Sequence, residues 1–403
     1  MEPISFMRCL VAGCVVLVLA GCGAGAATTS APPATSAPSR GDVVSVTPLE
    51  QLDAPAVAAR LREFGIDTGR VTGGVRAFRV EYRTVDPDGA PTTASSLVAV
   101  PEATPGGRLR LVSWQHGTTA HKAAAASVSV DSSDRAAAYF FAAAGHVVSA
   151  PDYLGLGVGP GAHPYNHHDS AVTASVDALR AARTVPGLVD RELDPRVLIS
   201  GFSQGGPAAM ALGRAMDDGA EPAFQVGALA PIAGPYDFTG SVAVAAPGGI
   251  AHATGYLGYL TVAWNRLHHL YGDPAEAFRP PYDRTIEALF DGTHPFEEIE
   301  PKLPATPAEL FTPAFLDQLQ HPTGALRDAL NAADATCDWV PSVPVRIYHA
   351  ASDLDVPVAN AEFCRRALAE RGAAAEVVAL GDIEHLDSMG AALPLVLDQF
   401  AAS

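Results

Sequence analysis

The most informative part of the chain is Val197-Leu-Ile-Ser-Gly-Phe-Ser-Gln-Gly-Gly-Pro-Ala-Ala-Met210. It contains a Gly-x-Ser-x-Gly motif centred on Ser203. In a chain with 37 glycines such a motif is expected by chance with a probability of about 0.2, so the motif alone is weak evidence. Its surroundings strengthen it, because an apolar strand-like run enters the motif and a run of small, helix-forming residues leaves it. We therefore predict a strand–turn–helix unit in which Ser203 is a nucleophile with an exposed hydroxyl at a strained turn.

Strand-like and helix-like segments alternate along most of the chain. The strand-like runs are apolar at both odd and even positions, which is typical of strands covered by helices on both faces. The predicted strands are residues 75–84, 96–100, 109–115, 146–150, 197–201, 226–232, 345–350 and 376–380. The predicted helices are residues 131–144, 170–184, 204–216, 360–371 and 391–401. This alternation predicts an α/β fold with a mostly parallel central sheet flanked by helices.

Residues 239–342 break the alternation, because they contain no good candidate for a buried strand. We interpret this interval as an inserted helical cap. Its aromatic side chains could form a core of the cap's own or the wall of a pocket below it. These aromatic residues are Tyr256, Tyr259, Trp264, Tyr271, Phe278, Phe290, Phe296, Phe311 and Phe315.

A serine hydroxyl becomes a good nucleophile when a base removes its proton, and the base needs an acidic partner. Asp353 follows a predicted strand, and His385 is the only histidine after it. The order Ser203, Asp353, His385 is one of the known orders of a catalytic triad, and each residue follows a predicted strand. Asp355 is the alternative acid, and a surface loop position without a catalytic role is the alternative for His385.

The developing negative charge on a substrate oxygen needs two preorganised N–H donors. We expect one to be the backbone N–H of Gln204, at the start of the helix that follows the serine. We expect the other to be the backbone N–H of Thr118, in the turn after the predicted strand at residues 109–115, with Gly117 as the alternative.

Five short motifs together resemble the secretory lipase family of α/β-hydrolases. They are Gln115-His-Gly-Thr118, Pro151-Asp-Tyr-Leu-Gly-Leu-Gly157, His163-Pro-Tyr165, Gly201-Phe-Ser-Gln-Gly-Gly206 and Ser352-Asp-Leu-Asp-Val-Pro357. The resemblance covers most of the chain from about residue 75 onward. It implies an α/β-hydrolase fold, hydrolysis of carboxylic esters through an acyl-enzyme, and often a helical cap over an acyl pocket. It also favours Asp353 over Asp355, because the family spacing is Asp-x-x-Val-Pro.

The N-terminal residues resemble an export signal. Arg8 precedes an apolar run at residues 9–20, which is too short to span a membrane but has the length of a signal-peptide core. The run ends in Leu19-Ala-Gly-Cys22, which resembles the lipobox of bacterial lipoproteins. The resemblance implies removal of residues 1–21 and lipidation of Cys22, which would hold the exported protein on the outer side of the cell membrane.

Residues 22–46 are rich in Ala, Thr, Ser, Pro and Gly, so we interpret them as a flexible tether ahead of the globular α/β domain at residues 47–403. An ordinary secretory peptide cut near Ala24 or Ala26, which would release the protein from the cell, is the alternative to lipidation.

Cysteine placement predicts one disulfide. Cys337 and Cys364 are the only cysteines outside the first 22 residues. Because export implies an oxidising compartment, we expect these two to pair, and two separate buried thiols are the alternative.

Composition excludes several classes of protein. With 26 Lys+Arg against 44 Asp+Glu the net charge is −18, which excludes a simple nucleic-acid binder with a basic face. A hydrophobic fraction of 48% and a charged fraction of 17% exclude a mainly disordered chain.

We expect neither a cofactor nor a metal. The glycine-rich turn at residues 155–161 contains Pro160, which blocks the immediate helix entry that a dinucleotide site needs. The histidines of His163-Pro-Tyr-Asn-His-His-Asp169 do not have the spacing of a tight tetrahedral site, so we interpret them as a structural loop near the active-site rim, where Asp169 could cap the next helix.

The expectation is therefore an exported, membrane-tethered serine esterase or lipase, acting as a monomer on a small-molecule or lipid ester. A serine peptidase of the same fold and a non-catalytic surface binding lipoprotein are the alternatives.

Overall fold

The structure is a computed structural model that describes residues 39–102, 108–188 and 191–403. The predicted signal peptide, the lipidation site Cys22 and most of the predicted tether lie outside the described residues. No helix within the described ranges has both the length and the apolar character needed to cross a membrane.

Nine strands of the described chain form one sheet in the order β1-β2-β3-β5-β4-β6-β7-β8-β9. Pairing is antiparallel from β1 to β3 and between β3 and β5, and parallel from β5 through β4 to β9. The predicted, mostly parallel α/β fold is confirmed. The strands are β1 (Val43–Leu52), β2 (Val75–Val85), β3 (Pro91–Pro101), β4 (Leu109–Gln115), β5 (Val147–Pro151), β6 (Leu193–Phe202), β7 (Gln225–Ile232), β8 (Val345–His349) and β9 (Ala375–Ala379).

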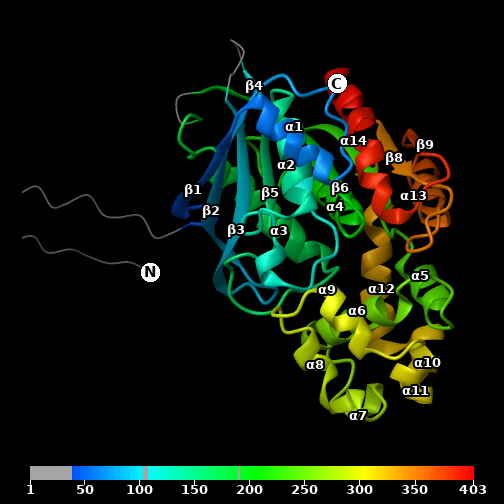
Figure 1. Cartoon of the computed structure of the whole chain (residues 1–403). Helices are drawn as coiled ribbons and strands as arrows, with labels where there is room; N and C mark the ends of the chain where they lie inside the picture. Colours follow the sequence, from blue (N-terminus) through cyan, green and yellow to red (C-terminus); the bar gives the residue numbers. More distant parts are fainter. Residues whose placement is uncertain (1–38, 103–107, 189–190) are drawn as a thin grey trace, which may run out of the picture. The chain divides into compact units, whose positions relative to one another are not determined.

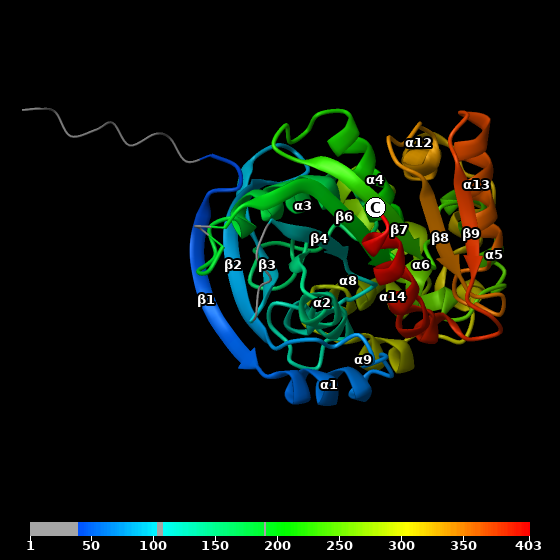
Figure 2. The same cartoon turned by 90° about the horizontal axis from the view of Figure 1, so that it is seen from above.

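Helices cover both faces of the sheet (Figure 2). One face packs against α3 (His168–Ala182), α4 (Gly205–Asp217) and α13 (Ala359–Glu370). The other face packs against α1 (Ala54–Glu63), α2 (Ser133–Ala143) and α14 (His385–Ala401). The two apolar cores explain why β4 and β5 are buried on both faces and apolar at both parities.

Between β7 and β8 the chain forms a series of helices, called the cap below, that lie together at one end of the sheet (Figure 1). They enclose a separate apolar core, which contains most of the aromatic residues named above, including Trp264, Phe278 and Phe311. Here Phe278 and Phe311 form an isolated β-bridge. The helices are α5 (Phe238–Ala245), α6 (Ala253–His268), α7 (Pro274–Ala277), α8 (Ile286–Leu289), α9 (Phe296–Ile299), α10 (Pro307–Leu310), α11 (Pro313–Gln320) and α12 (Gly324–Asp334).

Two N-terminal elements were absent from our prediction. β1 begins at Val43, so residues 43–46, which we assigned to the tether, belong to the sheet. β1 is an edge strand with only partial burial, so its sequence lacks the strong apolar pattern of the central strands. The helix α1 follows it, capped by the Asp53 side chain, which accepts a hydrogen bond from the Ala56 N–H.

The expected pairing of Cys337 with Cys364 is present. It joins a short 3₁₀ helix after α12, at Ala335–Cys337, to α13 on the face of the sheet. Both cysteines are fully buried in the core that α13 shares with the sheet.

Candidate active site

Ser203 lies in the turn between β6 and α4. Its backbone φ is +54°, in the left-handed region that non-glycine residues rarely occupy, which is the strain expected at such a turn. The turn is held by two backbone hydrogen bonds, from Ser203 N to Ile232 O at 2.9 Å and from Gly206 N to Ser203 O at 2.8 Å. A Cβ atom on Gly201 or Gly205 would collide with the backbone of Gln115 on β4. Glycine at these positions therefore lets the turn pack tightly against the neighbouring strand.

The structure brings Ser203, His385 and Asp353 together from three separate parts of the chain. Ser203 Oγ is 2.9 Å from His385 Nε2, and His385 Nδ1 is 2.7 Å from Asp353 Oδ2. All three side chains are buried. If Nδ1 carries the proton and donates it to the Asp353 carboxylate, Nε2 is free to accept the proton of the Ser203 hydroxyl. We expected His385 on a loop. It is instead the first residue of α14, because this helix begins six residues earlier than predicted.

The two candidate acids point to different places. Asp353 Oδ1 accepts hydrogen bonds from the backbone N–H groups of Asp355 at 3.0 Å and Val356 at 2.7 Å, while Oδ2 faces His385. The half-buried Asp355 carboxylate faces a pocket, where it accepts a hydrogen bond from Tyr256 Oη at 2.8 Å. The geometry thus pairs His385 with Asp353.

The expected oxyanion donors lie next to Ser203. Gln204 and Thr118 line the same pocket as Ser203, and neither backbone N–H has an acceptor within the described part of the chain. The N–H of Gly117, the alternative donor, instead faces the Asp134 carboxylate at 3.4 Å. The arrangement therefore fits Thr118 better than Gly117.

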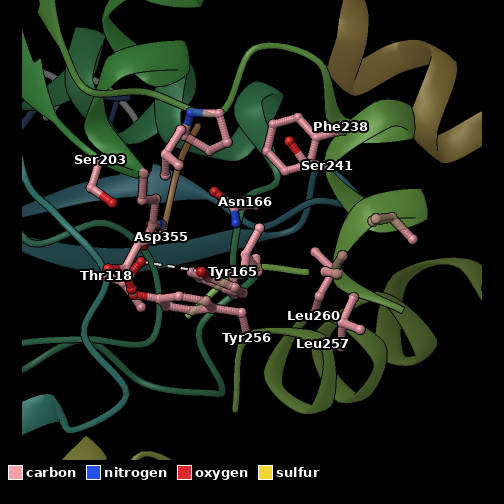
Figure 3. Close-up of a pocket in the computed structure, with 16 residues that line it drawn as sticks. Thr118, Tyr165, Asn166, Ser203, Phe238, Ser241, Tyr256, Leu257, Leu260 and Asp355 are labelled. Carbon is pink, nitrogen blue, oxygen red and sulfur yellow. Dashed lines mark hydrogen bonds between the residues drawn. The ribbon is translucent and has the colours of Figure 1, made fainter. Parts of the chain in front are cut away.

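A pocket opens at Ser203 between the sheet and the cap (Figure 3). Its cavity volume of about 70 Å³ is smaller than the roughly 300–1,000 Å³ typical of small-molecule sites. The apolar part of its wall comes largely from α5 and α6, whose contributions include Phe238, Val242, Leu257 and Leu260. Of the cap aromatics named from the sequence, Tyr256 lines this pocket.

Comparison with solved structures places this geometry in a known fold. The rice cell wall degrading esterase LipA from Xanthomonas oryzae matches with a TM-score of 0.76 at 26% identity, covering 90% of this chain and 96% of LipA. A Legionella pneumophila protein assigned as a hydrolase matches with a TM-score of 0.80 at 25% identity, covering 89% of this chain and 97% of that protein. Candida antarctica lipase A matches with a TM-score of 0.61 at 15% identity, covering 86% of this chain and 78% of the lipase.

This chain has the α/β-hydrolase fold. No protein-family model matches the sequence, and no curated protein sequence matches it either.

Within the α/β-hydrolase fold, the His163-Pro-Tyr165 motif lies closer to the candidate site than we had expected. Burial lowers the pKa of His163 to about 3, so its ring is neutral. Its Nδ1 atom is 2.9 Å from the carbonyl oxygen of Leu154, and its Nε2 atom is 2.9 Å from the Gln204 side-chain amide nitrogen. We had assigned this segment to a structural loop at the site's rim. The His163-Pro-Tyr165 motif was the only signal in the sequence, and it does not reveal the contact, because Gln204 lies 41 residues from His163 along the chain.

No group of three or more His, Cys, Asp or Glu side chains in the described ranges is arranged to hold a metal ion. In the segment from His163 to Asp169, burial also lowers the pKa of His167 and that of His168, the latter to about 3. His168 is instead packed edge-on against the Phe238 ring of the cap, with ring centroids 5.4 Å apart.

Proposed function

We propose that this chain is an exported serine hydrolase that cleaves carboxylic esters, with Ser203, His385 and Asp353 as its catalytic triad. The observation that carries the proposal is the chain of short contacts from Ser203 Oγ through His385 to Asp353, at the mouth of a largely apolar pocket. The similarity to an esterase at 26% identity over 90% of the chain supports the ester class.

In the proposed reaction, Ser203 Oγ attacks the ester carbonyl carbon while its proton passes to His385 Nε2. The carbonyl oxygen becomes an oxyanion that accepts hydrogen bonds from the N–H groups of Gln204 and Thr118. The tetrahedral intermediate then releases the alcohol, which takes the proton from His385. Water then attacks the acyl-enzyme while His385 takes its proton, and the second tetrahedral intermediate releases the acid as His385 returns that proton to Ser203 Oγ. Asp353 holds the imidazole in orientation and stabilises its protonated form.

The pocket suits an acyl or alkyl group better than a charged peptide. Its lining residues include no Lys, Arg or His, so it offers no cation for a peptide carboxylate among the residues that the structure describes. The catalytic groups complete the proposed chemistry without a cofactor or metal, and we propose that the enzyme acts as a monomer.

The proposal is tested by hydrolysis of p-nitrophenyl esters of increasing acyl length by the soluble domain. We expect turnover by the wild type, loss of turnover in Ser203→Ala, and no change in Ser45→Ala, a control on the exposed edge strand β1. A fluorophosphonate should label the wild type and the control but not Ser203→Ala. A wild-type protein that neither hydrolyses these esters nor reacts with the probe would overturn the proposal, and faster turnover of peptide anilides would make it a peptidase.

We further propose that Cys22 carries lipid and tethers the exported protein to the cell membrane. The buried Cys337–Cys364 disulfide supports an oxidising compartment. Cys22→Ala should abolish metabolic labelling by radioactive palmitate and move the protein out of the membrane fraction. Labelling that survives this substitution would contradict the assignment.

A further inference from the structure

Residues 163–165 contact the side chains of both proposed oxyanion residues. His163 Nε2 is 2.9 Å from the Gln204 side-chain nitrogen. The Tyr165 and Thr118 hydroxyls share a hydrogen bond of 3.1 Å, and both side chains line the pocket (Figure 3). We propose that His163 and Tyr165 are positioning residues that hold Gln204 and Thr118 where their backbone N–H groups can bind the oxyanion. This inference rests on the proposed function and deepens it.

In the contact between His163 and Gln204, the Gln204 amide must be the donor and the His163 ring the acceptor. His163 is buried, and its Nδ1–H donates to the carbonyl oxygen of Leu154, so its Nε2 can only accept. The Gln204 amide therefore donates to it. Gln204 Oε1 is also buried but has no partner among the described residues, so the amide depends on His163 for its orientation. Gln204 itself provides the N–H next to the nucleophile.

The second contact connects the oxyanion turn to the cap. The Tyr165 ring stacks on Tyr259 of α6, with centroids 4.2 Å apart and planes 6° from parallel. Trp264 of the same helix donates its indole N–H to the Tyr165 carbonyl oxygen at 3.1 Å. Tyr259 Oη in turn donates to the carbonyl oxygen of Thr119 at 3.2 Å. Helix α6 therefore contacts the turn that carries Thr118 both directly and through Tyr165.

These contacts matter because the two N–H donors come from different loops. Thr118 follows β4 and Gln204 follows β6, so their separation depends on what lies between them. A shift of about 1 Å in a catalytic geometry can cost on the order of 100-fold in rate. Loosening the contacts should therefore lower kcat more than it changes KM, because the oxyanion exists only after attack.

The test for Tyr165 is a double-mutant cycle with Thr118. Thr118→Val and Tyr165→Phe each remove one hydroxyl and keep every backbone N–H. We expect each to lower kcat by about 10-fold with little change in KM, and the double variant to be no slower than the worse single variant. Tyr259→Phe, which keeps the stacked ring, should lower kcat in the same direction.

The matching cycle for His163 combines His163→Leu with Gln204→Leu, which also keeps the backbone N–H. If His163→Leu does not fold, Gln204→Leu still tests the contact from the other side. Tyr271→Phe is the control, because its hydroxyl contacts Glu287 within the cap, away from the pocket. It should leave kcat unchanged.

An alkyl trifluoromethyl ketone tests whether the variants bind the oxyanion more weakly, because its adduct with Ser203 places an alkoxide where the oxyanion forms. Ser203 adds to its carbonyl carbon, the proton passes to His385, and the ketone oxygen becomes an alkoxide. The affinity of this adduct should fall by the same factor as kcat/KM in the Thr118, Tyr165 and Gln204 variants.

Unchanged kcat in these variants of an active enzyme would overturn this inference and leave the proposed function intact. Multiplicative losses in the double variants would overturn it as well, since the paired residues would then act independently. A wild-type protein without turnover would overturn both proposals.

Discussion

Asp353 and Asp355 are separated by one residue, yet the fold sends their carboxylates to different surroundings. Asp353 is enclosed by backbone N–H groups and His385, whereas Asp355 faces the pocket with Tyr256 as its hydrogen-bond partner. At the scale of single residues, similar side chains therefore acquire different roles. In the proposed mechanism Asp353 orients the base, whereas Asp355 contributes a carboxylate to the pocket wall.

We predict that Asp353→Asn lowers kcat by about 10³- to 10⁴-fold, because an amide cannot stabilise the protonated imidazole. Asp355→Asn, which keeps the size and the backbone contacts, should change kcat far less. Steady-state kinetics with one p-nitrophenyl ester compare the two. A larger loss in Asp355→Asn would transfer the role of the acid to that residue.

Asp355 should also discriminate against anionic substrates. A carboxylate with no cation in the pocket lining repels a like charge in a region partly shielded from water. Asp355→Asn should raise kcat/KM for the anionic p-nitrophenyl monoester of adipate relative to p-nitrophenyl hexanoate by about 10-fold. Glu370→Gln, at the exposed end of α13, removes the same charge far from the pocket lining and should leave the ratio unchanged. Equal ratios in all three proteins would argue against a role for Asp355 in selectivity.

At the scale of elements, the disulfide links the end of the cap to α13, a helix that packs against the sheet. Cys337 follows the last cap helix and Cys364 lies on α13, 27 residues further along the chain. Closing a loop of this length restricts the unfolded chain, which stabilises the folded state by about 3–4 kcal/mol in the chain-entropy model.

The double variant Cys337→Ala/Cys364→Ala should therefore lose about 3–4 kcal/mol of unfolding free energy. Denaturation in urea measures the change, with the wild type under reducing conditions as a second comparison. A variant as stable as the oxidised wild type would show that the bond does not contribute through loop closure.

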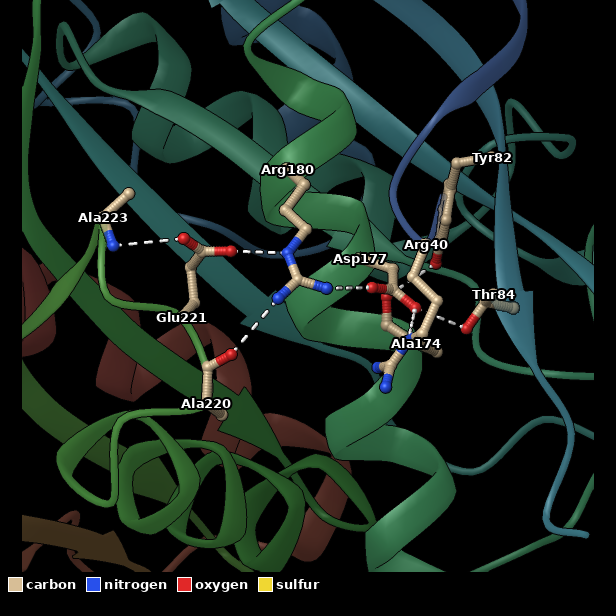
Figure 4. Close-up of polar contacts among 9 residues, drawn as sticks. All are labelled: Arg40, Tyr82, Thr84, Ala174, Asp177, Arg180, Ala220, Glu221 and Ala223. Carbon is tan, nitrogen blue, oxygen red and sulfur yellow. Dashed lines mark hydrogen bonds and ion pairs between the residues drawn. The ribbon is translucent and has the colours of Figure 1, made fainter. Parts of the chain in front are cut away.

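At the scale of the whole molecule, a network of charged side chains connects distant parts of the chain (Figure 4). The fully buried Asp177 on α3 contacts Arg180 at 2.7 Å and Arg40 at 3.0 Å, and accepts a hydrogen bond from Thr84 on β2 at 2.8 Å. Arg180 also pairs with Glu221 ahead of β7. The network thus joins the start of the described chain to the sheet and to α3.

Asp177→Asn should destabilise the protein by about 1.5–3 kcal/mol, because the buried side chain loses its charge-assisted hydrogen bonds to Arg40 and Arg180, while both arginines are partly exposed and Arg180 keeps Glu221 as a partner. Asp328→Asn, in an exposed pair with Arg327, should leave the unfolding free energy nearly unchanged. Thermal and urea denaturation of both variants would test the contrast, and equal effects would contradict it.

The sequence was sufficient for features that depend on neighbouring residues. The turn at Ser203 could be predicted because a strand, two flanking glycines and a helix start are consecutive in the chain, and the central strands could be predicted from their continuous apolar runs. The edge strand β1 and the first six residues of α14 were not predicted, since partly exposed segments carry a weak pattern.

Contacts between distant segments of the chain could not be predicted from the sequence, and only the tertiary structure shows them. Ser203 and His385 are 182 residues apart. Parallel pairing places the ends of β6, β8 and β9 at the same edge of the sheet, where the segments that carry Ser203, Asp353 and His385 converge. The sequence places two candidate aspartates after β8. Only the structure shows that Asp353 faces His385, whereas Asp355 faces the pocket. The contacts of His163 and Tyr165 with Gln204 and Thr118 arise in the same way, because burial and packing bring together side chains whose order along the chain predicts no contact.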